Sequence, residues 1–536
     1  MRFFNTAGPV NCQKHYCLPP LVRIDLNKII SLIEQEKYFV LHAPRQTGKT
    51  SCLLALMDYL NQQGKYRCLY FNVEMGQSAR EDVKRGMRAI LSELASMADD
   101  FLGDRFPEKI RREVLEQHGE DTVLNKVLTL WTKQSPKPLI LLIDEVDTLI
   151  GDTLISLLRQ LRTGYPKRPA LFPQSIILCG VRDVRDYRIH SDREKAIITG
   201  GSAFNVKAES LRLGDFSGKE VETLYDQHTE ETGQKFDSEV FDLVWEYTQG
   251  QPWLVNALGY EVCFKTEKDR NRKKVITAEM IVQAKENIIQ RRETHIDQLV
   301  DKLQEKRVQR VVEPMLKGES LNKISVDDLQ YVIDLGLVKR TTRGPQPANA
   351  IYREIIPREL SFITQLNFES TIDPVWYIQK DGSLDMHKLL SGFQDFFREH
   401  SEHWVERFDY KEAGPQLLLQ AFLQRIVNGG GRIEREYGLG RMRTDLLVVW
   451  PRAAGKEDKW GRKEVQKVVI ELKVLYKSLE KTISDGLQQI LQYMDRCGTD
   501  EGHLVIFDRT PSKNWKEKIF TKAETIQEKT IMVWGM

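Results

Sequence analysis

The stretch that decides the fold runs from residue 38 to residue 51 and reads YFVLHAPRQTGKTS. Its apolar first part, Tyr38 to His42, predicts a buried strand, and the pattern from Cys52 to Leu60 predicts a helix. The loop between them matches the phosphate-binding pattern G-x-x-x-x-G-K-[ST], except that Ala43 replaces the first glycine. Backbone N–H groups at such a helix start favour a bound phosphate. The stretch therefore predicts a nucleotide-binding loop, against the alternative of a chance strand-turn-helix.

Each polar position of this loop has an expected role. Gly48 allows close approach of the phosphates, Lys49 reaches the β- and γ-phosphates, and the Thr50 hydroxyl holds Mg²⁺. Alanine is strained at a positive φ, so Ala43 either adopts another φ or leaves the loop imperfect. The expected cofactors are ATP and Mg²⁺. The predicted nucleotide-binding residues are Ala43, Pro44, Arg45, Gln46, Thr47, Gly48, Lys49, Thr50, Ser51, Asp144 and Arg182.

A second strand carries the residues expected to complete this site. The apolar run Leu139 to Ile143 ends in Asp144 and Glu145, and ligands of parallel sheets bind at the carboxyl ends of strands. Asp144 is expected to hold Mg²⁺ and Glu145 to polarise the attacking water. Arg182, after the next strand, either senses the γ-phosphate or pairs with a neighbouring aspartate, Asp183 or Asp186.

The spacing of apolar runs predicts an α/β fold for the amino-terminal part. Four short runs alternate with helical stretches, which is typical of a parallel sheet covered by helices on both faces. The pattern becomes helical after about residue 211. The order of elements in residues 327–360, with strands at 337–340 and 351–355, resembles a winged helix. The four predicted strands are residues 38–42, 66–73, 139–143 and 175–179.

Together these segments resemble the AAA-like ATPases related to the STAND and archaeal ATPase group. The resemblance implies a helical lid, whose Gly-Gln-Pro element begins a helix near the nucleotide, followed by a winged helix. It also implies that His15, Tyr16 and Arg23 lie near the adenine. The segments that carry it are residues 5–9, 42–50, 143–147, 180–183, 204–206 and 250–253.

A second group of polar residues lies near the carboxyl end of the chain. Asp445 follows a predicted hairpin turn, and the strand Val468 to Val474 carries Glu471 and Lys473. The two-residue period of a strand points Glu471 and Lys473 to the same face. Polar side chains on an inner strand are costly unless partnered, which favours a divalent-metal site with Asp445 and Glu471 as ligands of Mg²⁺ or Mn²⁺. Lys473 is expected to orient water and stabilise a phosphate. The alternative is an ordinary solvated strand.

The order Asp, then Glu-x-Lys, resembles the PD-(D/E)XK nucleases. The helix Ile483 to Arg496 extends the resemblance, because Gln489 matches a glutamine that many members place beside the metal, with Tyr493 one turn later on the same face. The acidic residue often found on the preceding helix is here Gln416 or Gln420, and no proline precedes Asp445. The predicted catalytic residues are Glu145, Asp445, Glu471, Lys473 and Gln489, and the predicted metal ligands are Thr50, Asp144, Asp445 and Glu471.

The expected partner is nucleic acid, with DNA favoured over RNA. Four arginines around the hairpin, Arg432, Arg435, Arg441 and Arg443, either clamp phosphates or form a solvated rim. Arg159 and Arg162 are candidates for an arginine finger that reaches a neighbouring subunit, which implies a homo-oligomer.

Composition limits the remaining choices. The chain has 536 residues, with 79 Lys and Arg against 77 Asp and Glu, so we expect three or four domains, a mixed-sign surface and no large overall charge. No apolar run approaches the ~20 residues of a membrane span. We expect a cytoplasmic protein without membrane contact. Seven scattered cysteines are unlike a disulfide framework, so most are expected to be buried small hydrophobes.

The sequence therefore predicts a multidomain α/β protein. The leading hypothesis is an ATPase that controls a metal-dependent DNA endonuclease, in defence against foreign DNA or in work on mobile DNA; the alternative is an ATP-dependent switch or scaffold that binds nucleic acid without cutting it. The predicted parts are a P-loop ATPase domain at 1–210, a helical lid at 211–310, a winged-helix-like domain at 311–370, a connecting helical segment at 371–403 and a nuclease-like domain at 404–536.

Overall fold

The structure is a computed structural model of the 536-residue chain, which divides into two compact units. Unit 1 comprises Met1–Val311 and Asn322–Arg353, and unit 2 comprises Val312–Leu321 and Glu354–Met536. The structure describes all residues except 184–187, 192–195, 200–202, 266–270, 292, 318–323, 343, 357–376, 380, 408–418, 420–421, 424–431, 440–441, 452–464, 476–477, 509, 511–512 and 528.

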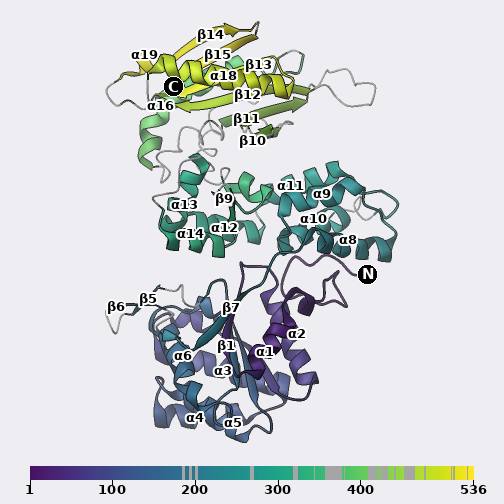
Figure 1. The fold of residues 1–536 in the computed structure, drawn as a ribbon, viewed down its shortest axis with the longest axis vertical. Helices are drawn as coiled ribbons and strands as arrows, with labels where there is room; N and C mark the ends of the chain where they lie inside the picture. Colours follow the sequence, from purple (N-terminus) through teal and green to yellow (C-terminus); the bar gives the residue numbers. More distant parts are fainter. Residues whose placement is uncertain are drawn as a thin grey trace. The chain divides into compact units, whose positions relative to one another are not determined.

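Unit 1 is built around a five-stranded parallel sheet (Figure 1). The four predicted strands are present, and a fifth that the sequence pattern did not reveal, β7, pairs with the edge of β1. In spatial order the strands are β2 (Arg67–Asn72), β3 (Leu139–Asp144), β4 (Ser175–Gly180), β1 (Tyr38–His42) and β7 (Lys207–Arg212).

Helices cover both faces of this sheet, which confirms the predicted layering. Alternate residues along the strands enter two separate apolar cores, so that Val40 and Leu141 pack on one face and Leu41 and Leu142 on the other. Strands buried on both faces explain why each strand reads as a continuous apolar run. The helices of this part are α1 (Leu26–Glu34), α2 (Lys49–Gln62), α3 (Val83–Leu102), α4 (Phe106–His118), α5 (Val123–Gln134) and α6 (Gly151–Gly164).

The rest of unit 1 is mostly helical, as the spacing of apolar residues predicts. Short 3₁₀ turns occur at Pro20–Arg23 (η1), Glu74–Ala79 (η2), Val146–Thr148 (η3) and Tyr165–Lys167 (η4), and a hairpin is formed by β5 (Arg188–Ser191) and β6 (Ala196–Thr199). The helices are α8 (Gly218–Thr232), α9 (Ser238–Thr248), α10 (Pro252–Phe264), α11 (Ala278–Arg291), α12 (Thr294–Leu303), α13 (Lys306–Lys317), whose second half is assigned to unit 2, and α14 (Val326–Asp334).

One predicted strand of the winged-helix-like segment is wrong. The strand β8 (Val338–Thr341) pairs with β9 (Gly344–Pro347), and residues 350–356, predicted to contain a strand at 351–355, are helical. The β-branched residues Ile351 and Ile355 are spaced four apart, and both are buried. A helix buries residues with this spacing on one face, so packing outweighs the β propensity of isoleucine here.

Unit 2 contains a six-stranded mixed sheet. The strands β10, β11 and β12 are antiparallel, β12, β13 and β15 are parallel, and β14 returns antiparallel to β15. The elements are α16 (Met386–Arg407), β10 (Arg432–Leu439), β11 (Met442–Pro451), β12 (Val465–Val474), α18 (Leu479–Cys497), β13 (Glu501–Phe507), α19 (Trp515–Lys518), β14 (Phe520–Ile526) and β15 (Lys529–Gly535).

The two faces of this sheet have different coverings. Val468, Ile470 and Leu472 of β12 share a core with residues of α16, whereas Val469 packs with residues of α18. This alternation confirms the predicted two-residue period of the strand. Glu471 belongs by the same period to the face that α18 covers.

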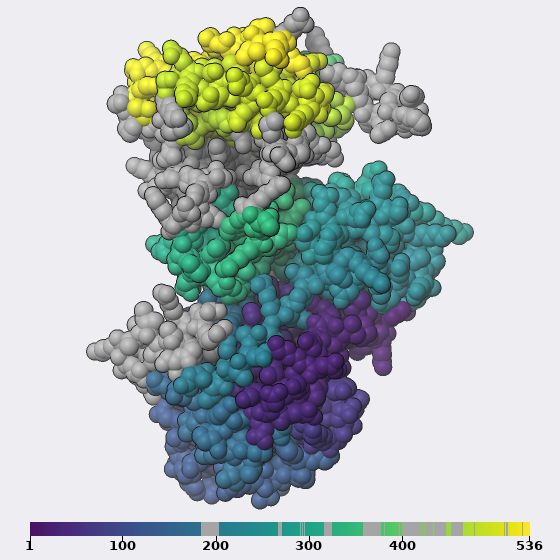
Figure 2. All heavy atoms as spheres, viewed as in Figure 1, coloured from purple at the N-terminus to yellow at the C-terminus, as the bar shows by residue number. Residues whose placement is uncertain are grey.

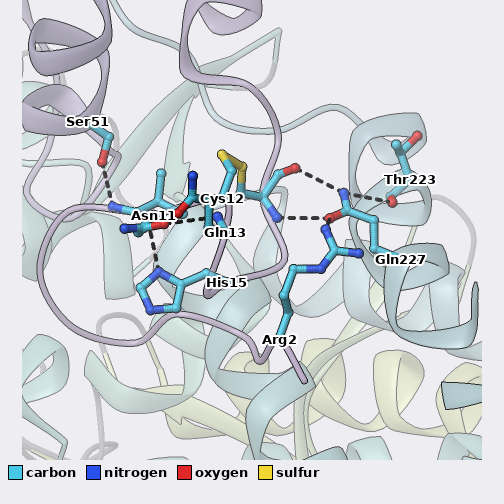
Figure 3. The surroundings of a disulfide bond; sticks show 10 residues. Arg2, Asn11, Cys12, Gln13, His15, Ser51, Thr223 and Gln227 are labelled. Atoms are coloured by element: carbon cyan, nitrogen blue, oxygen red, sulfur yellow. Dashed lines mark hydrogen bonds between the residues drawn. A yellow bond between two sulfur atoms is a disulfide. The ribbon is translucent and has the colours of Figure 1, made fainter. Parts of the chain in front are cut away.

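The amino-terminal segment contains a disulfide that the sequence analysis did not predict. Cys12 and Cys17, five positions apart in the sequence, are bonded to each other (Figure 3). The backbone of Cys17 exchanges two hydrogen bonds with the Gln227 amide of α8, and the N–H of Val10 donates to the Ser51 hydroxyl on α2. Figure 2 shows these first residues, in purple, against the teal helices that follow the sheet. The other cysteines are buried thiols, as predicted.

Among the helices of the described residues, none is long and apolar enough to cross a membrane.

Candidate nucleotide site

The loop between β1 and α2, residues 43–50, is called the phosphate loop below. Its first residue, Ala43, is fully buried, and its N–H donates to the Gly180 carbonyl of β4 at 3.2 Å, so it continues the pairing of β1. The loop residues with positive φ are instead Gln46, at 56°, and Gly48, at 93°. Alanine in place of the first glycine therefore causes no backbone strain.

Gly48 is required by its conformation, since its φ of 93° is strained for other residues, and it also lies close to a long side chain. A Cβ at this position would lie 2.7 Å from Nη1 of Arg23. That guanidinium donates to the Thr47 carbonyl at 2.6 Å and to the Gly214 carbonyl at 2.7 Å, and it lies over the Phe216 ring. Arg23 thus ties the phosphate loop to the segment that follows the sheet.

The Lys49 ammonium lies within the loop. Its side chain is 5% exposed, and Nζ donates to the carbonyls of Ala43 at 3.0 Å and Pro44 at 3.1 Å. The Thr47 hydroxyl also donates to the Pro44 carbonyl, at 2.7 Å. These bonds hold a positive charge at the start of α2, where the helix dipole already favours an anion.

Thr50 and Asp144 meet, as the sequence predicts. The Thr50 hydroxyl donates to Oδ2 of Asp144 at 2.7 Å, and the fully buried carboxylate also accepts from the Tyr70 hydroxyl at 3.2 Å and from the Glu145 N–H at 2.9 Å. Burial and the neighbouring Asp144 raise the pKa of Tyr70, which keeps its hydroxyl protonated as a donor. A hydroxyl beside a carboxylate is an oxygen pair of the kind that Mg²⁺ prefers, so these residues fit that ion.

Sequence analysis missed Tyr70 as a member of the site. A signal was present: a tyrosine in a strand buried on both faces needs a hydrogen-bond partner for its hydroxyl. The parallel pairing of Asn72 with Asp144 brings the carboxyl ends of β2 and β3 together, and this supplies the partner.

Glu145 occupies a left-handed conformation, φ 56°, directly after β3. Burial raises the pKa of its carboxyl to about 7, an effect that Asp147 and Asp144 reinforce and that the Lys49 ammonium opposes. A carboxyl with a pKa near neutrality can both accept and release a proton at working pH. This property suits the predicted role of a general base.

Arg182 has a partner that neither predicted alternative included. Its Nε lies 3.4 Å from Oδ2 of Asp334 at the end of α14, and its guanidinium lies over the Tyr331 ring. Both charged side chains are buried, at 6% and 1% exposed. Asp183 instead pairs with Lys207 at 2.5 Å, and Asp186 lies outside the described residues.

A pocket opens beside the phosphate loop, between the amino-terminal segment and α10. Tyr16 and Arg23, which the family resemblance implies near the adenine, both line it, together with Trp253. His15 is not among the lining residues. The Trp253 indole N–H donates to the Thr6 carbonyl at 2.8 Å, which fixes the segment over the pocket.

The expected site in unit 2 is described in part. The Glu471 side chain is 4% exposed and accepts from the Lys473 ammonium at 2.7 Å. Leu446 of β11 pairs with Ile470 of β12, so the backbone of the preceding residue, Asp445, lies near that of Glu471 on the neighbouring strand. The side chain of Asp445 lies outside the described residues. Gln489 is exposed on α18, whereas Tyr493 is buried, so these two residues do not share an environment.

Further expected residues are placed as follows. Arg159 and Arg162 are exposed on α6. Arg432, Arg435 and Arg443 belong to β10 and β11, and Arg441 lies outside the described residues. Among the described side chains, no group of three or more His, Cys, Asp or Glu could hold a metal ion.

The sheet, the loop at the start of α2 and the Thr50–Asp144 contact together define the fold of a P-loop ATPase, which implies a nucleotide-binding site. A family model described as an AAA-like domain matches residues 24–357, more than half of the chain. The chain belongs to this family. The match includes the phosphate loop and α14, and it leaves the sheet of unit 2 outside.

The solved structures that match this chain are distant in sequence. The Walker-type ATPase PABY2304 of Pyrococcus abyssi is 13% identical with a TM-score of 0.44, over 66% of this chain and 99% of that chain. Cdc6p from Pyrobaculum aerophilum is 14% identical with a TM-score of 0.33, over 63% and 93%. The RuvB Holliday junction branch migration motor of Thermotoga maritima is 13% identical with a TM-score of 0.33, over 62% and 93%. No match to a curated protein was found.

Proposed function

We propose that unit 1 binds and hydrolyses ATP with Mg²⁺, and that its nucleotide state controls a metal-dependent nuclease domain in unit 2. The observation that carries the first half is the 2.7 Å contact between Thr50 and Asp144 beside the buried Lys49. A positive charge, a hydroxyl and a carboxylate at one helix start match the needs of a nucleoside triphosphate and its cation.

Each residue of this site has its own proposed role in hydrolysis. Lys49 and the N–H groups at the start of α2 bind the phosphates, and Thr50 and Asp144 would hold Mg²⁺. The ion, when bound, supplies charge neutralisation on the phosphate oxygens. Glu145, with its pKa of about 7, accepts the proton of the attacking water. Arg182 could contact the γ-phosphate only by exchanging its bond to Asp334.

The nuclease assignment is supported by the arrangement of unit 2. An antiparallel hairpin is followed by a parallel strand pair, and Glu471 and Lys473 lie two residues apart on the inner strand β12. The strand register brings the Asp445 backbone beside them. Asp445 and Glu471 would hold Mg²⁺ or Mn²⁺, and Lys473 would orient water. The exposed position of Gln489 supports no contact with the metal in this arrangement.

The proposed substrate is nucleic acid, with DNA favoured, and the proposed setting is defence against foreign DNA or the processing of mobile elements. The arginines at 432, 435, 441 and 443 are expected to bind the phosphate backbone. Arg159 and Arg162 are exposed on α6, and one of them is proposed to reach a neighbouring copy in a homo-oligomer. These parts of the proposal rest on the family resemblance.

The first experiment incubates the full chain with plasmid and linear DNA, with Mg²⁺ or Mn²⁺ and with or without ATP. Glu471→Gln removes the buried carboxylate, and Glu480→Gln, an exposed glutamate in the first turn of α18, is the matched control. Cutting that needs metal and Glu471 but not Glu480 supports the nuclease. Absence of cutting with ATP hydrolysis intact favours the alternative, a switch or scaffold that binds nucleic acid.

The ATPase is tested separately by Lys49→Ala. We expect loss of ATP binding, since the ammonium that faces the phosphates is removed, whereas Lys65→Ala changes an exposed lysine of unit 1 and leaves binding intact. Equal affinity in Lys49→Ala and Lys65→Ala would refute the assignment of the phosphate loop.

A further inference from the structure

His295 connects the phosphate loop to a segment far along the chain. It lies in the first turn of α12 and is 7% exposed. Its Nδ1 lies 2.5 Å from Oε1 of Gln46, inside the phosphate loop, and its Nε2 lies 2.6 Å from the Tyr352 hydroxyl. No sequence motif identifies this residue, because its partners are 249 and 57 positions away.

The two hydrogen bonds fix the protonation of the ring. An amide oxygen only accepts, so Nδ1 must donate to Gln46, and in a neutral imidazole Nε2 then accepts from the Tyr352 hydroxyl. Burial lowers the pKa of His295 to about 4, so the ring is neutral at physiological pH. The bonds therefore run in one direction, from Tyr352 through His295 to Gln46.

The ring has little freedom to move. It stacks on the Trp253 indole with 4.8 Å between centroids and an interplanar angle of 17°, and Tyr352 stacks at 6.0 Å and 27°. Trp253 is in turn held by the Thr6 carbonyl. A close-packed ring transmits displacement of one partner to the other, because the packed arrangement cannot deform continuously.

The phosphate loop meets the same distant segment at a second point. A Cβ on Gly336, just before β8, would lie 2.8 Å from the Pro44 ring, so the backbone at Gly336 packs closely against that ring. Gln46 itself holds a positive φ of 56°, which is uncommon for a residue other than glycine and is maintained by its surroundings. The His295 bond is part of those surroundings.

We propose that His295 is a positioning residue of the phosphate loop, and that the chain Gln46–His295–Tyr352 couples nucleotide binding to residues 344–353. This inference rests on the proposed nucleotide binding, and it adds a route by which the bound nucleotide controls the rest of the chain. Unit 2 resumes at Glu354, so the coupled segment is the one that leads into it.

The coupling follows from linkage. Phosphates bound by the loop favour one arrangement of residues 43–50, and Gln46 is one of these residues. Tyr352 is linked to Gln46 by two hydrogen bonds through His295, so the arrangement of the loop that phosphate favours changes the free energy of the segment around Tyr352. By linkage, a change in the conformation of that segment changes the nucleotide affinity by the same free energy. Removal of one hydroxyl from this chain should reduce both effects.

The experiment uses the full chain and hydrogen exchange of residues 344–353, with and without Mg²⁺ and a non-hydrolysable ATP analogue, and nucleotide affinity is measured in parallel. Tyr352→Phe removes one hydroxyl and keeps the ring. Tyr225→Phe is the matched control, because Tyr225 is fully buried in unit 1 and its hydroxyl donates to the Val255 carbonyl at 2.8 Å.

We expect nucleotide to change the exchange of residues 344–353 in the unchanged protein and in Tyr225→Phe. In Tyr352→Phe that change should fall at least twofold while the nucleotide still binds. His295→Gln, whose longer amide can reach Tyr352 but not Gln46, should weaken nucleotide binding about tenfold. His295→Asn, whose amide takes the place of Nδ1 and can bond Gln46, should bind nucleotide more tightly than His295→Gln.

Three results would overturn the inference. The first is nucleotide binding to the unchanged protein without altered exchange at 344–353. The second is a full response in Tyr352→Phe. The third is an equal loss of response in Tyr225→Phe, which would make the effect one of general stability. If the unchanged protein binds no nucleotide at all, the proposed function fails and the coupling fails with it.

Discussion

Asp334→Asn offers a direct test of how α14 is held against the sheet of unit 1. The variant removes the negative charge next to Arg182 while keeping the size of the side chain. The amide oxygen can still accept from the Gln330 side chain, which bonds Oδ1 of Asp334 at 2.8 Å. The expected loss therefore comes from the ion pair with Arg182.

The magnitude follows from the distance and burial of the pair. At 3.4 Å and an effective dielectric constant of ~20, the attraction is about 5 kcal/mol. Removing one partner of a buried ion pair costs ~3–5 kcal/mol, because the other charge remains buried. The asparagine amide nitrogen that then faces Arg182 cannot accept the hydrogen bond that Oδ2 accepted, so the ion pair is lost without a substitute, and we expect a loss of about 3 kcal/mol or more in the free energy of unfolding of unit 1.

The matched control is Asp327→Asn on the same helix. Asp327 pairs with Arg307 at 2.7 Å, but these side chains are 29% and 33% exposed, and such pairs contribute ~0–1 kcal/mol. Calorimetry of the full chain is the assay, because two units need not unfold in one transition. Leu504→Ala, in the core of unit 2, identifies that unit's transition.

We expect Asp334→Asn to lower the transition temperature of unit 1 by about 5 °C or more, and Asp327→Asn to change it by less than about 2 °C. Equal shifts in the two variants would refute the reasoning, since they would show that burial of the Arg182 pair adds nothing to its strength.

Three further predictions concern the nucleotide site. The kcat/KM of ATP hydrolysis should rise with pH through about 7, because the Glu145 carboxyl must lose its proton to act as base. A rate that is flat from pH 6 to 8 would contradict this role. Glu145→Gln should bind ATP normally but hydrolyse it at least ~100-fold more slowly. Thr50→Val should weaken Mg²⁺-dependent ATP binding about tenfold through loss of one hydroxyl, as measured by titration, with Thr50→Ser close to the unchanged protein. Gly48→Ala should weaken nucleotide binding, because alanine is strained at φ 93° and its Cβ would displace the Arg23 guanidinium 2.7 Å away, whereas Gly103→Ala, at a helix end with open space, should bind normally.

Local sequence patterns predicted the parts of unit 1 that depend on neighbours in the chain. The apolar run before Ala43 and the Gly-Lys-Thr sequence define a strand, a loop and a helix within 25 residues, so the phosphate loop could be located directly. The meeting of Thr50 and Asp144 was also predictable, because parallel strands place their carboxyl ends at one edge. The strand β7 was not predicted, because its residues, Lys207–Arg212, are only partly buried and mostly polar, so they form no apolar run.

The residues that sequence reasoning missed share a different property: each acts through a contact with a remote segment. Asp334 is 152 positions from Arg182, and His295 is 249 positions from Gln46. A polar side chain alone predicts an exposed position on the surface. Because Asp334 and His295 are buried, their hydrogen bonds instead hold Arg182 and the phosphate loop in place. Both residues come from helices that follow the sheet of unit 1, His295 from α12 and Asp334 from α14, and both lie within the AAA-like match to residues 24–357. Helices that carry no nucleotide-binding motif therefore contact the phosphate loop and Arg182, and a nucleotide that displaces either contact changes the free energy of these helices.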